Sequence, residues 1–328
     1  MEASTTMGQR TDGRFRILSL DGGGIKGVFT ASVLAELEHM TGKRVVEYFD
    51  LLTGTSTGGI IALALAVGIP AGKILDFYTN YGPTIFPAIG IETRWWRGLR
   101  RIMRAKHDGT VLRNALATVF ADKKLGHASC RVVIPAFDAL GGRVHLFKTC
   151  HCERFRQDYQ RSCVHMALAT AAAPTYLPAF QADDGTAYVD GGVWANDPIL
   201  VGVLEAIVNL HHAPEDLDVL SIGTTEEPFH ISKRRRRRGG ILQWALGVVP
   251  LLMHAQAEAA RAQAGILLPS QPLRINRYVE PGRFSMDDSR QINDLDGLGR
   301  LEARRYEKAI SERFLSTRTQ PFRPCHTP

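Results

Sequence analysis

Residues 49–62, with the sequence FDLLTGTSTGGIIA, decide the fold that we predict for this chain. A hydrophobic strand over 49–53 runs into a tight turn, and a helix follows. The turn holds the pattern G-x-S-x-G, with Ser56 between Gly54 and Gly58. A serine in this position stands on a sharp strand-to-helix bend, at the positive end of the helix, which suits a nucleophile. The alternative is a glycine-rich turn in which the serine only caps the helix.

Strand and helix patterns alternate along most of the 328 residues, which favours an α/β fold with a largely parallel sheet. Further strands are expected at 14–21, 131–139, 143–150, 186–190, 217–224 and 273–279. Helices are expected at 28–40, 70–81, 111–120, 162–172, 198–210 and 294–314, with a loop at 82–90. We predict one domain over 13–316, a disordered tail over 1–12 and a C-terminal tail over 317–328, also disordered.

The net charge of +7 is concentrated in two stretches. One is the run of six basic residues at 233–238, and the other, at 92–106, holds candidate membrane or lid contacts at Trp95, Trp96, Arg97 and Arg101. Tryptophan and arginine suit a membrane surface, while arginines also suit the phosphates of a nucleotide. A solvated basic face is the alternative for both. We do not expect nucleic-acid binding, because it would leave the glycine-rich turns unexplained.

The five cysteines are odd in number and include no C-x-x-C pair, which indicates free thiols in a reducing compartment. We read Cys150-His151-Cys152 as a strand end and expect no metal site. The N-terminus lacks the apolar segment of a secretory signal. The apolar stretch 241–255 contains Pro250 and is shorter than the about 20 residues that span a bilayer. We therefore expect a cytoplasmic protein with at most peripheral membrane contact.

Three glycine-rich turns each follow an expected strand: GGGIKG at 22–27, GTSTG at 54–58 and DGG at 190–192. Ligand sites in open parallel sheets form where strand ends meet loops, so these turns can converge on one crevice. The first turn also fits a dinucleotide-binding loop, but that fold needs an acid at the end of the second strand, where this chain has Ser56. We interpret the first turn as an oxyanion hole built on Gly22, Gly23, Gly24 and Gly27.

Ser56 needs a general base, and two arrangements are conceivable. Asp190 followed by His254 has the order of a Ser-His-Asp hydrolase, but His254 lies in an apolar helical segment with no turn around it. Asp190 stands at a strand end before Gly191 and Gly192, where its carboxylate can contact the serine hydroxyl directly. A turn or capping role is the alternative for Asp190.

The three motifs, in this order, resemble the patatin-like phospholipase family. The resemblance covers FRILSLDGGGIKGVFTASVLAELE, YFDLLTGTSTGGIIALALA, ALATAAAPTYLPAF and YVDGGVWANDPILVGVLEA, and SMDDS at 285–289 is similar to a segment near the family's C-terminus. It implies a three-layer α/β/α sandwich and a Ser-Asp dyad without histidine. Ser56 is then the nucleophile, Asp190 the general base and the 22–27 turn the oxyanion loop, with motif glycines at Gly54, Gly58, Gly191 and Gly192.

The chain length and TIFP at 84–87 look like the bacterial cyclic-oligonucleotide-activated phospholipases of CBASS antiviral defence, of the CapV type. That resemblance implies a serine acyl hydrolase that degrades membrane phospholipids at the inner face of the cell membrane. A cyclic di- or trinucleotide such as cGAMP, made by a partner nucleotidyltransferase, would act as allosteric activator. Catalysis would need no cofactor. Both a monomer and a homo-oligomer are compatible with the sequence. The alternative is a constitutive patatin-like lipid acyl hydrolase without nucleotide control.

Overall fold

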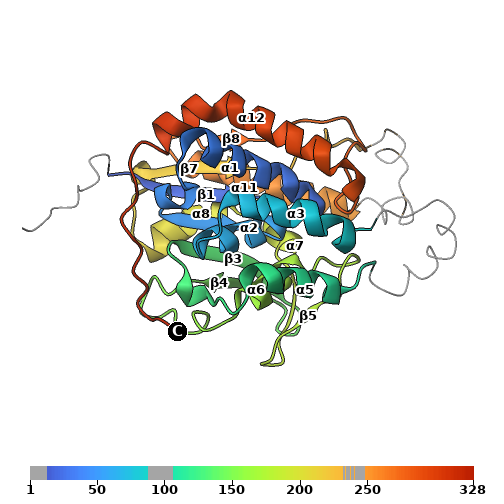
Figure 1. Ribbon diagram of the computed structural model, residues 1–328, viewed down its shortest axis with the longest axis horizontal. Coiled ribbons are helices and arrows are strands. Elements are labelled where there is room, and N and C mark those ends of the chain that lie inside the picture. The colour runs from blue at the N-terminus through green and yellow to red at the C-terminus, as the bar shows by residue number, and fades with distance from the viewer. Residues whose placement is uncertain (1–12, 88–105, 232, 234–236, 238–239, 241–247) are drawn as a thin grey trace, which may run out of the picture.

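The structure is a computed structural model that describes residues 13–87, 106–231, 233, 237, 240 and 248–328 (Figure 1). The strands are β1 (Phe15–Leu20), β2 (Leu51–Gly54), β3 (Arg131–Asp138), β4 (Arg143–Lys148), β5 (Phe180–Gln181), β6 (Ala187–Asp190), β7 (Leu217–Ile222) and β8 (Leu273–Ile275). The helices are α1 (Gly27–Thr41), α2 (Thr57–Ala66), α3 (Ala71–Ile85), α5 (Gly109–Phe120), α6 (Cys163–Ala171), α7 (Gly192–Ala195), α8 (Ile199–Leu204), α11 (Val248–Leu267) and α12 (Ile292–Arg313).

Within the described residues, eight strands form one mixed sheet in the order β5-β6-β3-β2-β1-β7-β8, with β4 also paired to β3. The pairs β1–β2, β1–β7, β2–β3 and β7–β8 are parallel. The pairs β3–β4, β3–β6 and β5–β6 are antiparallel. The predicted α/β fold with a mostly parallel sheet is therefore confirmed.

Helices cover both faces of this sheet, as the three-layer prediction requires (Figure 1). Side chains alternate along each strand, so Leu18 and Leu20 of β1 join a core with α1, α2, α3, α5, α6 and α12. Phe15 and Ile17 point the other way, into a smaller core with α8 and α11. Burying one such side chain contributes about 1.5–3 kcal/mol, and the two cores sandwich the sheet.

The prediction that a loop begins at residue 82 is wrong, because α3 continues through Pro83 to Ile85. Packing accounts for the extra turn. A Cβ atom at Gly82 would lie 2.7 Å from Cδ1 of Ile25 and 3.1 Å from Cδ1 of Ile292, so glycine lets the helix lie this close without displacing these side chains. Tertiary contacts of this kind override the weak helical propensity of Gly and Pro.

Residues 317–328, which we predicted to be a disordered tail, form no helix or strand but lie against the domain. The Thr319 N–H donates to the carbonyl of Glu47 at 2.9 Å, and the Cys325 N–H donates to the carbonyl of Cys150 at 2.7 Å. These bonds fix both ends of the segment. Among the described residues, no helix is both long and apolar enough to cross a membrane.

Candidate active site

Ser56 lies between β2 and α2 on a strained backbone, with φ 54° and ψ −121°. A non-glycine residue keeps such left-handed values only where the surrounding structure enforces them. The elbow is too tight for side chains at its glycines. A Cβ at Gly54 would lie 2.2 Å from the carbonyl oxygen of Gly58, and one at Gly58 would lie 2.3 Å from that of Leu20. The Ser56 N–H donates to Oγ1 of Thr170 at 3.0 Å, which holds the turn in this shape.

The pairing of β3 explains how Asp190 reaches Ser56. Strand β4 pairs with residues 133–138 of β3, while β2 pairs with 131–133 and β6 with 136–138. Because β4 takes one edge of β3, β2 and β6 must follow each other along the opposite edge. β2 runs parallel to β3 and β6 runs antiparallel, so their carboxyl ends meet. Those two ends lead to Ser56 and Asp190.

Asp190 is buried, with 4% of its surface exposed, and its carboxyl group accepts a hydrogen bond from the Ser56 hydroxyl. The Gly192 N–H donates to Oδ1 of Asp190 at 2.7 Å. Burial disfavours the charged form and raises the pKa of Asp190 to about 6, although both hydrogen bonds act to lower it. The carboxylate is therefore ionised at neutral pH and is a stronger base than an exposed aspartate, whose pKa is about 3.9.

His254, the alternative partner considered from the sequence, has other neighbours. Its ring stacks on Phe229 at a centroid distance of 4.9 Å, and its Nδ1 lies 4.0 Å from the carboxylate of Glu226. Within the described part of the chain, no histidine lines the cavity beside Ser56. The geometry favours a Ser-Asp pair over a Ser-His-Asp triad.

The glycines of the 22–27 turn differ in what their N–H groups contact. The Gly22 N–H donates to the carbonyl of Asn196 at 2.9 Å, and the Gly27 N–H donates to the carbonyl of Gly24. Neither can bind an oxyanion without losing these bonds. The N–H groups of Gly23 and Gly24 have no hydrogen-bond partner among the described residues. Of the four glycines expected to build the oxyanion loop, these two therefore have backbone donors that are available to a ligand.

Thr57, the residue after the serine, offers a further backbone N–H. It is the first residue of α2, so its N–H has no partner within the helix. In hydrolases with a G-x-S-x-G elbow, the N–H at this position forms part of the oxyanion hole. The Tyr78 hydroxyl hydrogen-bonds both the carbonyl oxygen of Thr57, at 3.1 Å, and its side-chain hydroxyl, which holds this end of α2 in place.

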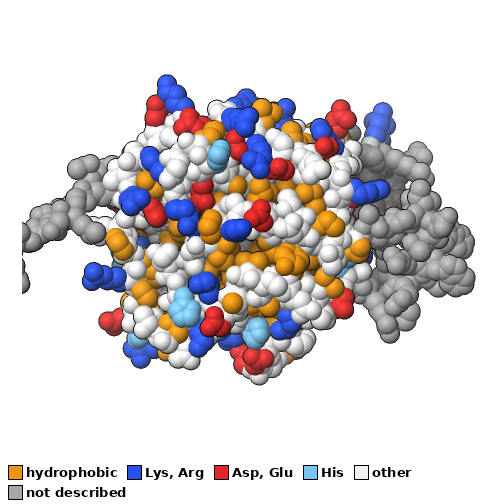
Figure 2. Space-filling view, in the orientation of Figure 1, with side chains coloured by type: hydrophobic (Ala, Val, Ile, Leu, Met, Phe, Trp, Pro, Cys, Tyr) orange, Lys and Arg blue, Asp and Glu red, His pale blue; other side chains and the backbone are white. Residues whose placement is uncertain are grey.

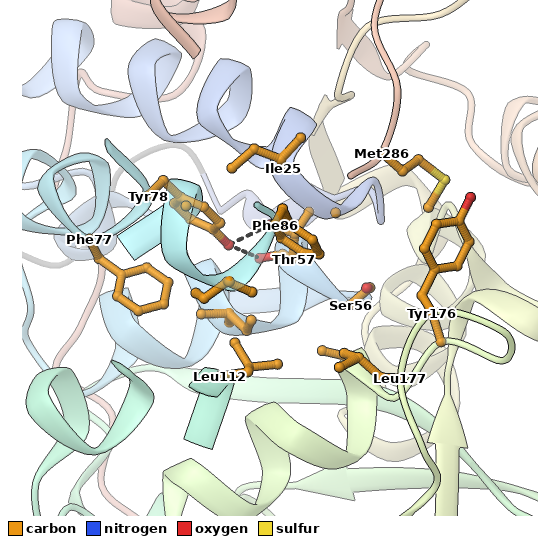
Figure 3. Close-up of a pocket in the computed structure, with 16 residues that line it drawn as sticks. Ile25, Ser56, Thr57, Phe77, Tyr78, Phe86, Leu112, Tyr176, Leu177 and Met286 are labelled. Carbon is orange, nitrogen blue, oxygen red and sulfur yellow. Dashed lines mark hydrogen bonds between the residues drawn. The ribbon is translucent and has the colours of Figure 1, made fainter. Parts of the chain in front are cut away.

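A narrow apolar cavity extends from Ser56 (Figure 3). Ser56 lies at one end of it, close to Leu177 and Tyr176, and Phe77 lies at the other end. The remaining wall is apolar and includes Ile25, Ile60, Ile85, Phe86, Leu112 and Met286. Its free volume is about 50 Å³, and a single water needs at least about 10–15 Å³ on such a measure. The cavity thus has the chemistry of an acyl-chain site but must widen to admit a long chain.

The SMDDS segment, residues 285–289, contacts the 22–27 turn, which is the candidate oxyanion turn. The Met286 carbonyl accepts a hydrogen bond from the Ile25 N–H at 2.9 Å. The neighbouring Asp287 forms an ion pair with Lys106, so the segment is fixed on a second side. The sequence singled out this segment only by resemblance, because no local pattern shows that its backbone contacts a turn some 260 residues earlier.

The candidate membrane contacts Trp95, Trp96, Arg97 and Arg101 lie outside the described residues. Of the basic run at 233–238, the structure describes only two residues, both exposed. Figure 2 shows basic and acidic side chains interspersed over the face that carries α1, α3 and α12. The net positive charge of the chain is therefore not gathered on that face.

A serine on a strained elbow, at the carboxyl edge of a mostly parallel sheet and beside an apolar cavity, is an arrangement that fits an enzyme that hydrolyses lipid esters. The sequence profile of the patatin-like phospholipases matches residues 18–203, and the chain belongs to that family. It is accordingly a lipid ester hydrolase.

Three relatives illustrate the similarity. A cGAMP-activated phospholipase of Pseudomonas aeruginosa is 34% identical over 288 residues, covering 86% of this chain and 82% of the relative. A protein of the same name from Vibrio cholerae is 34% identical, covering 77% and 76%. Patatin-like protein 4 of Arabidopsis thaliana is 28% identical, covering 92% and 83%.

Proposed function

We propose that this chain hydrolyses the carboxylic ester bonds of membrane phospholipids through a dyad of Ser56 and Asp190. The observation that carries the proposal is the hydrogen bond from the Ser56 hydroxyl to the buried Asp190 carboxyl group, on an elbow that is strained to present the serine. The apolar cavity beside Ser56 suits the acyl chain of such a substrate.

In the proposed acylation step, Asp190 takes the hydroxyl proton while Oγ of Ser56 attacks the ester carbonyl carbon. The N–H groups of Gly23, Gly24 and Thr57 hold the resulting oxyanion, and loss of one such donor typically lowers the rate by about 100- to 1000-fold. The tetrahedral intermediate then collapses. The lysophospholipid oxygen leaves with the proton from Asp190, and the acyl group stays on Ser56.

Deacylation repeats the same chemistry with water. Asp190 removes a proton from a water molecule as that water attacks the acyl-Ser56 carbonyl. The second tetrahedral intermediate releases the fatty acid, and Oγ of Ser56 regains the proton from Asp190. Every group in both steps belongs to this chain, to the substrate or to water.

The enzyme is further proposed to be switched on by a cyclic oligonucleotide such as cGAMP, made by a partner nucleotidyltransferase in bacterial antiphage defence of the CBASS type. It would then degrade phospholipids at the inner face of the cell membrane. The relatives named cGAMP-activated phospholipase support this control. The narrow cavity at Ser56 supports it as well, because a resting enzyme needs a site that does not admit its substrate freely.

The dyad is tested with a fluorogenic phospholipid and the variants Ser56→Ala and Asp190→Asn, each checked for folding by circular dichroism. Both should lose ester hydrolysis by at least about 100-fold, because one lacks the nucleophile and the other the base. Near-normal hydrolysis by either folded variant would disprove the dyad.

A constitutive lipid acyl hydrolase is the second candidate, and the similarity to Patatin-like protein 4 over 92% of the chain favours it, because that name mentions no activator. The wild-type rate with and without cGAMP separates the two. Full activity without any nucleotide supports the constitutive enzyme, and a rate that rises with cGAMP supports the switch.

A further inference from the structure

A second cavity, of about 520 Å³, lies at the carboxyl ends of β7 and β8. This is the same edge of the sheet that carries Ser56, where open α/β sheets bind their ligands. Its volume is within the range of about 300–1,000 Å³ that is usual for small-molecule sites. The lining is polar and positively charged overall, since four arginines face two acids: Arg261, Arg274, Arg277 and Arg305 against Glu226 and Glu258. Arg261 ion-pairs with both of these acids, and carboxylates behind the lining pair with Arg274 and Arg277, so what the cavity offers a ligand is the guanidinium donors that these pairs leave unused.

Two of these arginines keep guanidinium groups available to a ligand. Within the described residues, Arg305 makes no hydrogen bond, and its nearest carboxylate oxygen, on Glu302, is 3.8 Å away. Arg277 uses only Nη1, in an ion pair with Glu302 at 3.0 Å. Other arginines of α12 differ, because Arg300 and Arg313 each hydrogen-bond carboxylates at 2.7–2.9 Å. The free donors are therefore a property of this cavity and not of the helix.

Two tyrosine rings stand beside these guanidinium groups. Tyr278 is 70% exposed, which is unusual for a large aromatic side chain, and it lines the cavity. Tyr306 lies under Arg305, with 5.6 Å between the guanidinium carbon and the ring centroid. Arginine donors bind phosphate oxygens in pairs, and aromatic rings stack on nucleobases.

We propose that this cavity binds a cyclic oligonucleotide, with Arg277 and Arg305 on its phosphates and Tyr278 and Tyr306 on its bases. The inference rests on the proposed nucleotide control and adds the place where the activator binds. A ligand with phosphates alone would use the arginines but leave the two rings without a partner. A nucleotide uses both.

The cavity is connected to the oxyanion turn by direct contacts. The loop after β7 carries Glu226 in the cavity wall, and two residues earlier Oγ1 of Thr224 donates to the carbonyl of Gly22 at 3.2 Å. At the base of the cavity, Nη1 of Arg274 donates to Asp21 at 2.9 Å, and Asp21 directly precedes Gly22. A ligand that moves this loop or Arg274 therefore changes the position of the turn that faces Ser56.

The test measures binding of cGAMP to the full chain by isothermal titration calorimetry, with inorganic pyrophosphate as a phosphate-only probe. Arg305→Ala and Tyr278→Ala should each weaken cGAMP binding by about 10- to 100-fold, since each removes a charge-assisted contact or a stacked base. Tyr278→Phe keeps the ring and should bind within about twofold of wild type. Lys308→Ala, on the same helix and 84% exposed, removes a positive charge outside the cavity and is the matched control.

Phospholipid hydrolysis as a function of cGAMP concentration gives the second readout. Arg305→Ala should need about 10- to 100-fold more cGAMP for half-maximal rate and regain the wild-type rate at saturation, which a misfolded variant would not do. If wild type responds to cGAMP and both alanine variants respond equally well, the site is elsewhere and nucleotide control stands. If pyrophosphate binds as tightly as cGAMP, the base-stacking role is wrong. If wild type neither binds nor responds to cGAMP, this site and nucleotide control both fall, while the dyad is unaffected.

Discussion

Replacing Asp190 with asparagine should make the folded chain more stable at pH 8 while it abolishes hydrolysis. Asparagine has nearly the same shape, and its Oδ1 can still accept the hydrogen bond from the Gly192 N–H. It cannot ionise, so it avoids the cost of holding a negative charge in a buried position. The same replacement of a carboxylate oxygen by an amide nitrogen would thus remove the proposed base and increase the stability of the fold.

The size of the effect follows from the pKa of Asp190, which burial raises from 3.8 to about 6. A carboxyl with a raised folded-state pKa stabilises the fold when protonated, and this contribution is lost as the pH rises through about 6. One pKa unit corresponds to about 1.4 kcal/mol, so ionisation lowers the free energy of unfolding by up to about 3 kcal/mol at pH 8. Asp190→Asn should therefore be about 1–3 kcal/mol more stable there, with roughly half the advantage at pH 5 and little at pH 4.

Urea unfolding of both proteins at pH 4, 5, 6 and 8, followed by circular dichroism, measures this dependence. Asp184→Asn serves as a control of opposite sign. Hydrogen bonds from Arg161 and Thr186 lower the pKa of Asp184 to about 2, so its loss should destabilise the protein at neutral pH and matter less as the pH falls toward 2. A stability difference for Asp190→Asn that does not vary with pH, or that is destabilising at pH 8, would refute the reasoning.

Three further predictions concern the same site. The kcat/KM of wild type should fall about tenfold per unit below pH 6 as Asp190 takes up its proton; a flat profile from pH 5 to 8 would contradict the assigned base. Gly58→Ala should unfold the elbow or lower the melting temperature by several degrees, because its Cβ would lie 2.3 Å from the carbonyl oxygen of Leu20; a fully active, equally stable variant would show that the elbow can relax. Asp287→Asn should lower kcat about tenfold with little change in KM, since Met286 would hold the oxyanion turn less firmly. The carboxylate of Asp288 pairs with Arg290 instead, so Asp288→Asn should leave kcat unchanged. Equal effects of the two variants would rule out a positioning role for Asp287.

Local patterns were enough to predict the elbow and the strands around it. Gly54 is required by its contact with the backbone of Gly58 in the same strand-turn-helix unit, and the spacing of the motif is visible in the sequence even though Gly58 itself contacts Leu20 of β1. The apolar side chains of β1, which divide between the two cores, likewise mark a strand in the sequence without any knowledge of its partners.

Features that depend on distant segments could not be predicted in the same way. The place of β6 on the same edge as β2 depends on pairings between strands far apart in the chain, and a short strand carries no mark of its partner. The extension of α3 beyond Gly82 depends on contacts with Ile25 and Ile292, which no local rule includes. The proposal that Gly23 and Gly24 bind the oxyanion depends on which N–H groups of the turn already donate hydrogen bonds within the fold, and the sequence does not show this.

Because β2 and β6 pair with the same edge of β3, that strand fixes the distance between Ser56 and Asp190. Thr53 pairs with Val133 and Asp190 pairs with Ala136, so a spacing of three positions along β3 sets the separation of the two strand ends that carry the proposed dyad. Loops leading into β2 and β6 can change in length without altering that separation. A two-residue slip of β6 along β3 would move Asp190 by about 7 Å, beyond reach of Ser56. A protein engineer could therefore exchange those loops freely but would have to leave the register of β3 untouched.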